Sequence, residues 1–185
     1  MPQIPGVLVV YRKPSERSAN PERLNLDRRE LSHLPLLEGE ERLRLLNLQH
    51  NNITKVENLV SLPNLIFLDL YNNQVGLRAR SLASDKGDFA PAHRSHPARA
   101  MLGKNFIERI RNLNSLTKLD VLDLHSNKIS KIENISHLSE LRVLNLANNL
   151  INVVDNLDGL VSLTELNLRR NLVNQTLLTR HRSNR

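Results

Sequence analysis

The 185-residue chain contains no cysteine and no tryptophan. It therefore cannot form disulfide bonds, and its fold must be held by packing and hydrogen bonds alone. Chains without cysteine suit a reducing compartment, so we expect a cytoplasmic location. Aromatic residues make up only 3% of the chain, too few for the stacking platforms of proteins that bind single-stranded nucleic acid.

Long apolar runs are missing as well. Residues 4–10 (IPGVLVV) form a short apolar stretch, but a helix that spans a bilayer needs about 20 such residues. A proline-glycine pair interrupts the stretch and no basic segment precedes it, which argues against a signal peptide. We expect no membrane association, and the sequons at Asn52, Asn134 and Asn174 are expected to carry no glycan.

The sequence also lacks the motifs of familiar enzyme chemistry. It has no glycine-rich phosphate loop, no nucleophile elbow, no zinc-ligand spacing and no paired catalytic carboxylates. His93 and His96 are spaced like metal ligands, but their segment offers no cysteine or further histidine to complete a coordination shell. We therefore predict no catalytic residue, no metal, no cofactor and no small-molecule substrate, and a function other than catalysis.

What the sequence does contain is a repeat. Six asparagines close the phrase L-x-x-L-x-L-x-x-N or a close variant of it, and four of the five intervals between them are 22 residues, whereas the remaining interval is 32. These ladder asparagines are Asn51, Asn73, Asn105, Asn127, Asn149 and Asn171. A fixed period in this range indicates a solenoid, and the phrase is that of a leucine-rich repeat.

The phrase also predicts local structure. Side chains alternate between the two faces of a strand, so Leu46 and Leu48 should point inward and Asn47 and Gln49 outward. Apolar residues spaced by about three after each asparagine predict a short helical or 3₁₀ return leg. We therefore expect an α/β leucine-rich repeat solenoid with a parallel β-sheet on its concave face. Its ladder asparagines should satisfy backbone groups of their own coil and of the next one.

The repeat divides the chain into five segments. We expect a flexible lead-in at 1–20, repeats at 21–75, an irregular basic insertion at 76–100, repeats again at 101–173 and a basic irregular tail at 174–185. The first coil is degenerate, because Arg29 replaces the asparagine, and a polar end coil of this kind serves as a cap. No cap follows the last strand, so Leu166 and Leu168 should be exposed, and we expect this end to fray or self-associate.

Two interpretations of residues 76–100 remain open. The segment is a functional loop inserted on one face of the solenoid, or it is not natural repeat sequence, as a translated intron or a mis-joined gene would be. The second interpretation is favoured, because the segment lacks leucine at expected core positions as well as adding ten residues.

The formal charge of +7 raises the question of nucleic-acid binding. Residues 76–100 carry +3 and residues 169–185 carry +5, so the rest of the chain carries −1. The excess of cations lies where the repeat pattern fails, not along a folded groove that could follow a phosphate backbone. We therefore expect no nucleic-acid partner.

Recognition by the concave face is the function that remains for such a solenoid. Phe67, Tyr71 and His125 are large and partly apolar on an otherwise polar wall, which makes them candidate anchors for a protein partner. The alternative is that they only cover neighbouring leucines. The other candidates are outward polar residues of the same face: Asn47, Gln49, Asp69, Asp123, Asn145, Glu165, Asn167 and Arg169.

The repeats at residues 22–75 and 101–171 also resemble a known family. The 22-residue coil is similar to the short cytoplasmic class of leucine-rich repeats found in a phosphatase regulatory subunit, axonemal dynein light chain and centrosomal or ciliary scaffolds. More narrowly, LRLLNLQHNNIT, LIFLDLYNNQV and LDVLDLHSNKISKIENISHLSELRVLNLANN resemble the repeat domain of the leucine-rich-repeat subunit of the tubulin polyglutamylase complex.

This resemblance implies a non-catalytic scaffold subunit that helps to place a glutamate-ligating enzyme on microtubules. Its implied partners are the subunits of that tubulin-modifying ligase and tubulin itself, at microtubules, the centrosome or the cilium. Two alternatives stay open: a regulatory subunit of a protein phosphatase that uses the same concave face, and a truncated fragment without a stable partner.

Overall fold

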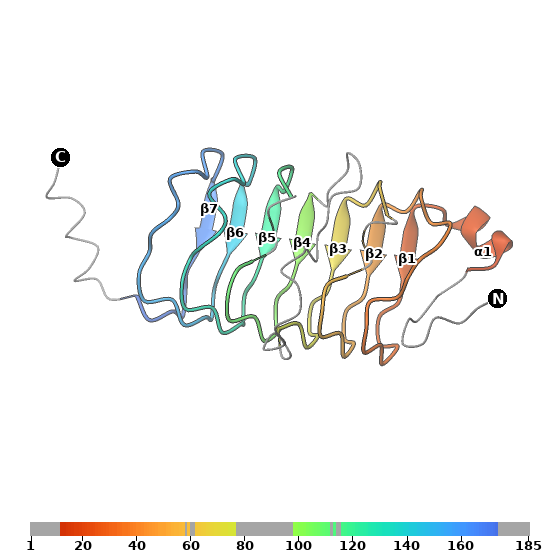
Figure 1. Cartoon of the computed structure of the whole chain (residues 1–185), viewed down its shortest axis with the longest axis horizontal. Helices are drawn as coiled ribbons and strands as arrows, with labels where there is room; N and C mark the ends of the chain where they lie inside the picture. Colours follow the sequence, from red (N-terminus) through yellow and green to blue (C-terminus); the bar gives the residue numbers. More distant parts are fainter. Residues whose placement is uncertain are drawn as a thin grey trace, which may run out of the picture.

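The computed structural model describes residues 12–57, 59, 62–76, 98–111, 113 and 116–173. Within these ranges seven short strands form one parallel sheet in sequence order (Figure 1). The strands are β1 Arg23–Asn25, β2 Leu45–Asn47, β3 Phe67–Asp69, β4 Arg99–Met101, β5 Val121–Asp123, β6 Val143–Asn145 and β7 Glu165–Asn167. They stack along one axis with β1 and β7 at opposite ends, so the predicted leucine-rich repeat solenoid is confirmed.

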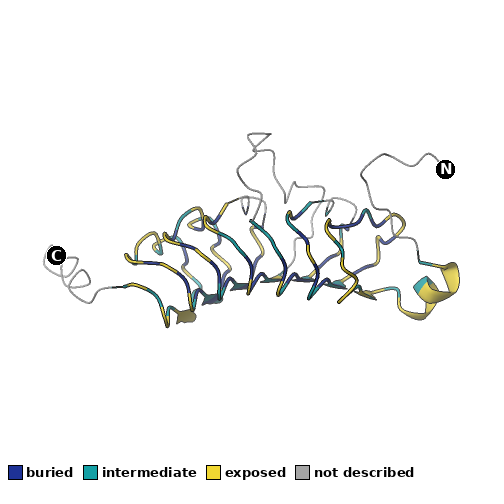
Figure 2. Ribbon diagram, turned by 90° about the horizontal axis from the view of Figure 1, so that it is seen from below, coloured by how far each residue is buried: buried dark blue, intermediate teal, exposed yellow. Residues whose placement is uncertain are grey.

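The register between the strands follows the period of the sequence. Leu46 aligns with Leu24 and with Leu68, 22 residues away in each direction, and Leu68 aligns with Ala100. From β2 to β6 the central residue of each strand points inward and is at most 1% exposed. Buried leucine and isoleucine residues therefore form one core cluster along the solenoid. Figure 2 shows buried stretches recurring from coil to coil, whereas α1 is mostly exposed.

The return legs are built from tight turns. In the coil that contains β2, the Leu62 N–H donates to the Leu59 carbonyl and the Leu65 N–H donates to the Leu62 carbonyl. The same pair of bonds recurs at residues 113–119, 135–141 and 157–163. Hydrogen bonds from residue i+3 back to residue i are those of a 3₁₀ helix, which confirms the predicted character of these legs.

Each ladder asparagine fastens its coil to the coil before it. The Oδ1 of Asn127 accepts a hydrogen bond from the Ile107 N–H at 2.9 Å, and its Nδ2 donates to the carbonyls of Leu102 and Leu124 at 3.0 and 2.9 Å. The same pattern occurs at Asn51, Asn73, Asn105, Asn149 and Asn171.

The direction of these bonds differs from the expectation that they reach the next coil. The bend of each coil leaves backbone groups unpaired, and the asparagine of the following coil lies over them. In the first coil, the N–H groups of Arg29 and Leu31 both donate to Asn51 Oδ1 at 3.0 Å. The backbone of a coil is therefore bonded by the asparagine of the coil that follows it. The first coil can have Arg29 at its own asparagine position, because Asn51 of the second coil makes these bonds.

The residue before the asparagine position has a left-handed backbone in every coil. Its φ lies between 50° and 57° at Arg28, His50, Asn72, Lys104, Ser126, Asn148 and Arg170. This conformation costs a residue other than glycine roughly 1–2 kcal/mol. Its recurrence with different side chains shows that the bonding of the turn, not the local residue preference, sets the backbone here.

The N-terminal segment contains a helix, although residues 1–20 were predicted to be a flexible lead-in. Helix α1, Pro14–Ala19, begins with a proline, whose fixed φ suits the first turn. The Lys13 N–H donates to the Glu16 carboxylate at 3.1 Å, which satisfies one of the free donors at the helix start. Residues 1–11 lie outside the described residues. In the described ranges no helix is both long and apolar enough to cross a membrane.

A buried carboxylate fastens this helix to the first coil. Glu40 has a side chain that is 1% exposed and pairs with both Arg12 and Arg17. The Arg12 guanidinium also donates to the carbonyls of Asn20 and Arg23. The helix therefore lies beside the β1 end of the solenoid (Figure 1).

The irregular segment predicted at 76–100 ends earlier than expected. Arg99 and Ala100 belong to β4, and Ala100 is fully buried at the position that leucine holds in the neighbouring strands. The core position is thus filled by a smaller side chain and is not deleted, which weakens the argument that the segment is not natural repeat sequence. Residues 77–97 and the predicted tail at 174–185 lie outside the described residues.

Candidate protein-binding face

The outward side chains of the sheet form the concave face, in three columns that run across all seven strands. The first column is Arg23, Leu45, Phe67, Arg99, Val121, Val143 and Glu165. The second column is Asn25, Asn47, Asp69, Met101, Asp123, Asn145 and Asn167. The third column, two residues further on, is Asp27, Gln49, Tyr71, Gly103, His125, Ala147 and Arg169.

Side chains of the second column form hydrogen bonds with the backbone just after each strand. The Oδ1 of Asn47 accepts the Gln49 N–H at 3.0 Å, and Asp69 Oδ1 accepts the Tyr71 N–H at 3.0 Å. The same bond to the residue two positions ahead occurs at Asn25, Asp123, Asn145 and Asn167. Short Asn and Asp side chains are well suited to accept from this N–H, so the frequent Asn and Asp residues in this column have a structural cause.

Five residues predicted to contact a partner therefore also make hydrogen bonds within the solenoid. The carboxylate of Asp69 also accepts from Gln49 Nε2 at 2.5 Å, and the residue is only 6% exposed. Asp69 is therefore a structural residue. The other four residues of this group are more exposed. In each of them the Oδ1 atom accepts the same hydrogen bond from the backbone N–H two residues on: Asn47, Asp123, Asn145 and Asn167.

The first column contains an apolar stripe. Leu45, Phe67, Val121 and Val143 are all half-buried, and Met101 of the second column is half-buried beside them. Arg99 interrupts the stripe and is exposed. Both β4 residues were missed because the break in the period concealed this strand. The phrase Met101-Leu-Gly-Lys-Asn105, counted backward from its asparagine, would have revealed them.

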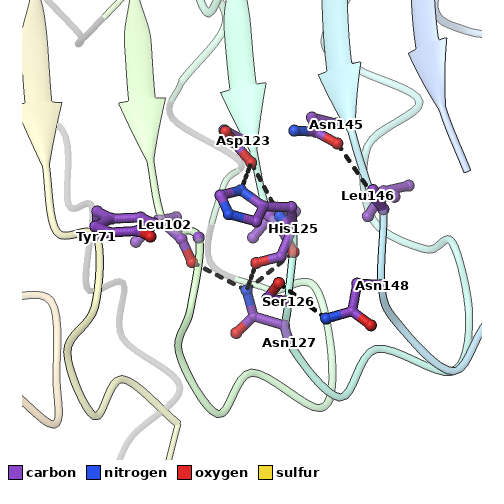
Figure 3. A network of polar contacts seen from close by, with 12 residues as sticks. Tyr71, Leu102, Asp123, His125, Ser126, Asn127, Asn145, Leu146 and Asn148 are labelled. Carbon is purple, nitrogen blue, oxygen red and sulfur yellow. Dashed lines mark hydrogen bonds and ion pairs between the residues drawn. The ribbon is translucent and has the colours of Figure 1, made fainter. Parts of the chain in front are cut away.

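Tyr71 and His125 are brought together, although a whole coil separates them. Their ring centroids lie 5.8 Å apart with an interplanar angle of 33°. The coil between them has Gly103 in this column, and a Cβ at that position would lie 2.3 Å from the His125 ring. The His125 Nδ1 is also 2.7 Å from Asp123 Oδ1, so the carboxylate orients the ring (Figure 3).

Two residues from the left-handed turns complete a ring cluster, which consists of His50, Tyr71, Lys104 and His125. The His50 ring meets Tyr71 edge-on at 5.8 Å, and Lys104 Nζ lies 5.3 Å from the centre of the Tyr71 ring. A cation over an exposed aromatic ring contributes about 0.5–1 kcal/mol. His50 and Lys104 were not predicted, because they lie in the turn after the strand and not on the strand itself.

Other polar groups of this face lie at β7 and beside the first column. Glu165, Asn167 and Arg169 are exposed on and after β7. Beside the first column, Arg142 donates to both carboxylate oxygens of Asp120, which lowers the pKa of Asp120. In the part of the chain that the structure describes, no group of three or more His, Asp or Glu side chains is placed to hold a metal ion.

The repeat sequence matches family models in two places. A model described as "Leucine rich repeat" matches residues 117–173, and one described as "Leucine Rich repeats (2 copies)" matches residues 41–79. Leucine-rich repeat-containing protein 49 of Homo sapiens is 48% identical over 67 residues, 36% of this chain and 10% of that protein. The Mus musculus protein of the same name is 49% identical over 64 residues, 35% of this chain and 9% of that protein. The chain thus matches about a tenth of the length of these curated relatives.

Solved structures of the same architecture are similar to this chain. An internalin from Listeria monocytogenes has a TM-score of 0.58 at 24% identity, over 78% of this chain and 42% of the internalin. A leucine-rich repeat protein of Leptospira interrogans has a TM-score of 0.60 at 24% identity, over 81% and 43%. A chain from an octameric complex of latrophilin 3, Unc5D and the leucine-rich repeats of FLRT2 has a TM-score of 0.62 at 24% identity, over 76% and 43%. At this identity the likeness shows the leucine-rich repeat fold alone, and the two family models match parts of the repeat region, residues 41–79 and 117–173.

Proposed function

We propose that the chain is a non-catalytic scaffold whose concave face binds a protein partner. The observation that carries this proposal is the half-buried apolar stripe at Leu45, Phe67, Val121 and Val143, which lies beside the ring cluster. Large side chains that keep part of their surface exposed on a polar wall are typical binding anchors. The FLRT2 repeats, which share this fold, were solved in a complex with other proteins.

We further propose that the chain is a subunit of a tubulin polyglutamylase complex that acts at microtubules. This step is supported by the resemblance of residues 22–75 and 101–171 to the leucine-rich-repeat subunit of that complex. The proposed partners are the tubulin-modifying ligase subunits, and tubulin itself is a candidate contact. The proposed location is the cytoplasm, at microtubules, the centrosome or the cilium.

Affinity capture of the tagged full chain from ciliated cells, followed by quantitative mass spectrometry, tests both proposals. Phe67→Ala should reduce recovery of the ligase subunits by roughly tenfold or more, since an anchor residue contributes about 2 kcal/mol. Val153→Ala is the matched control, because Val153 is also apolar, is 39% exposed and lies on a return leg. Circular dichroism should show that both variants are folded.

The outcomes separate the proposals. If ligase subunits are captured and Phe67→Ala has no effect, the concave face is not the binding surface. If a phosphatase catalytic subunit is captured instead, the chain is a phosphatase regulator and the polyglutamylase proposal is wrong. Capture of chaperones alone would contradict both proposals.

A further inference from the structure

The coil of β4 differs from its neighbours at every outward position. In the first column it has Arg99, where β2, β3, β5 and β6 have apolar residues. In the second column it has Met101, where the other six strands have Asn or Asp. Gly103 follows in the third column, and Lys104 lies in the turn. Arg99 and Lys104 are both exposed, so two cations lie on and just after the middle strand of the sheet.

The change at Met101 leaves a backbone donor without an acceptor. In the coil of β3, the Tyr71 N–H donates to Asp69 Oδ1 at 3.0 Å. Met101 has no oxygen to offer, and within the described ranges the Gly103 N–H has no hydrogen-bond acceptor. Gly103 is buried, and buried N–H groups are almost always paired. This N–H is therefore available to an acceptor that a ligand brings.

The free charge at the centre of the concave face is positive. Within the described part of the chain, Arg99 and Lys104 form no ion pair. The acids on and beside β3 and β5, by contrast, each accept at least one hydrogen bond from a neighbouring side chain. These acids are Asp69, Asp120 and Asp123.

We infer that the coil of β4 binds an extended acidic segment of the partner protein. One carboxylate would pair with Arg99, and a second would pair with Lys104 and accept the Gly103 N–H. The inference rests on the proposed function, because it concerns the partner of the concave face. Charge complementarity argues for this occupant: the two sites offer cations and a hydrogen-bond donor, which a carboxylate can pair with and accept from.

The spacing of the two sites defines the segment further. Arg99 and Gly103 are four residues apart, about 13 Å in an extended chain. In an extended partner segment, side chains four residues apart lie on the same face at the same separation. Acidic residues at this spacing therefore match both sites. The residue midway between them would lie over Met101, which favours an apolar side chain there.

The surroundings of both sites favour binding of a carboxylate. Phe67 and Val121 lie on either side of Arg99 in the register of the sheet. Apolar neighbours exclude water when a partner docks, and an ion pair is screened less where water is excluded. At the second site, Lys104 Nζ lies 5.3 Å from the centre of the Tyr71 ring, a contact that holds the cation beside this column.

Nuclear magnetic resonance titration of the isotope-labelled full chain tests the site directly. The probe is the peptide SESVSES, whose acids are four residues apart with valine midway, and SQSVSQS is its uncharged control. We expect SESVSES to shift the Gly103 amide resonance saturably and to bind at least about tenfold more tightly than SQSVSQS. Arg99→Glu or Lys104→Glu should weaken SESVSES binding about tenfold or more. Arg23→Glu is the matched control, because Arg23 lies in the first column at the end of the sheet.

Met101→Asn separates the backbone donor from the two cations. The asparagine should accept the Gly103 N–H, as its counterparts do in the other coils. This variant should be more stable to urea than the unmodified chain and should bind SESVSES more weakly, although both cations are still present. Unchanged SESVSES affinity would show that the Gly103 N–H does not take part and would overturn that half of the site.

The remaining outcomes test the inference as a whole. No saturable shift of the Gly103 amide up to about 5 mM peptide, equal affinity for both peptides, or affinity that survives both charge reversals would each overturn it. If SESVSES does not bind while Phe67→Ala still reduces capture of the ligase subunits, the acidic site is wrong and the proposed function stands. If SESVSES binds as expected but no ligase subunit is captured, the site is confirmed and the polyglutamylase proposal is wrong.

Discussion

The rings of Tyr71 and His125 contact each other across Gly103, with their centroids 5.8 Å apart. Neighbouring strands of a sheet lie about 4.8 Å apart, so side chains two coils apart are normally separated by the side chain between them. The missing side chain at Gly103 therefore couples β3 directly to β5. This contact joins the two halves of the repeat on the face proposed for binding.

Gly103→Ala should break this contact and destabilise the protein. The φ of Gly103 does not lie in the left-handed region, so its backbone accepts alanine, but the new Cβ would lie 2.3 Å from the His125 Cε1 atom. His125 must then swing away from Tyr71 and from Asp123. We expect a loss of about 1 kcal/mol in the free energy of unfolding, as for other aromatic pairs, measured by urea denaturation.

A double-mutant cycle separates this effect from a general intolerance of alanine at position 103. In a His125→Ala background the Gly103→Ala substitution should cost almost nothing, because the ring that it displaces is absent. An equal cost in both backgrounds would show that the clash with His125 is not the cause.

Replacing a ladder asparagine should cost more stability in the middle of the solenoid than in the last described coil. Asn127 is 8% exposed and lies between two complete coils, and its loss leaves the Ile107 N–H and the Leu102 carbonyl without their partner. Asn171 makes equivalent bonds but is half-buried in the last described coil. A buried group left unpaired costs about 1–3 kcal/mol. Asn127→Ala should therefore cost roughly 2–5 kcal/mol and clearly more than Asn171→Ala, as measured by urea denaturation of both variants.

The pair between Asp120 and Arg142 should make stability depend on pH in acid. Arg142 donates from Nε to Oδ1 at 2.5 Å and from Nη2 to Oδ2 at 2.8 Å, and these bonds lower the pKa of Asp120 from its ordinary value of 3.8. Folding thus favours the carboxylate, so this stabilisation is present above pH 3.8 and is lost as the pH falls through the lowered pKa.

Arg142→Gln should consequently destabilise the protein at neutral pH, and its cost should vanish once Asp120 is protonated in both the folded and the unfolded state. Denaturation of the variant and of the unmodified chain across this pH range measures the difference. The cost at neutral pH should also decrease with salt, since Arg142 is exposed. A cost that is the same at every pH would show that packing of the Arg142 stem is responsible.

The fold could be predicted from the sequence because one pattern determines it repeatedly. The positions of Leu46 and Asn51 recur every 22 residues, and each recurrence gives the same strand, turn and register. Where the spacing changes, the prediction was less accurate: Ala100 was excluded from the sheet, although its neighbours and Asn105 hold it in register. Helix α1 was missed because its attachment depends on Glu40, which lies outside the repeat pattern.

The candidate site was predictable only in part, for a physical reason. Alternation along a strand shows which side chains point outward, and it correctly placed Phe67 and Tyr71 on the concave face. It does not show which outward groups are engaged by neighbours, so Asp69 was taken for a partner contact. The meeting of Tyr71 and His125 depends on a missing side chain in a third coil, and only the register of β4 places Gly103 between them.

The attachment of the N-terminal helix provides a prediction about local stability. Glu40→Gln removes the charge that pairs with Arg12 and Arg17 while nearly preserving the size of the side chain. Hydrogen bonds to charged groups contribute about 1.5–3 kcal/mol each, and Arg12 keeps its bonds to two backbone carbonyls. We therefore expect a loss of roughly 2 kcal/mol that is concentrated at the β1 end.

Hydrogen exchange resolved by residue measures where this loss occurs. In a repeat protein each coil is stabilised mainly by its neighbours, so Glu40→Gln should speed exchange in α1 and in the coils of β1 and β2 while leaving β5 and β6 nearly unchanged. Glu22→Gln is the matched control, because Glu22 is also a glutamate near the β1 end but is exposed. Equal acceleration along the whole solenoid would mean that the Glu40 pairs support global cooperativity, and no acceleration would mean that the backbone bonds of Arg12 hold the helix without them.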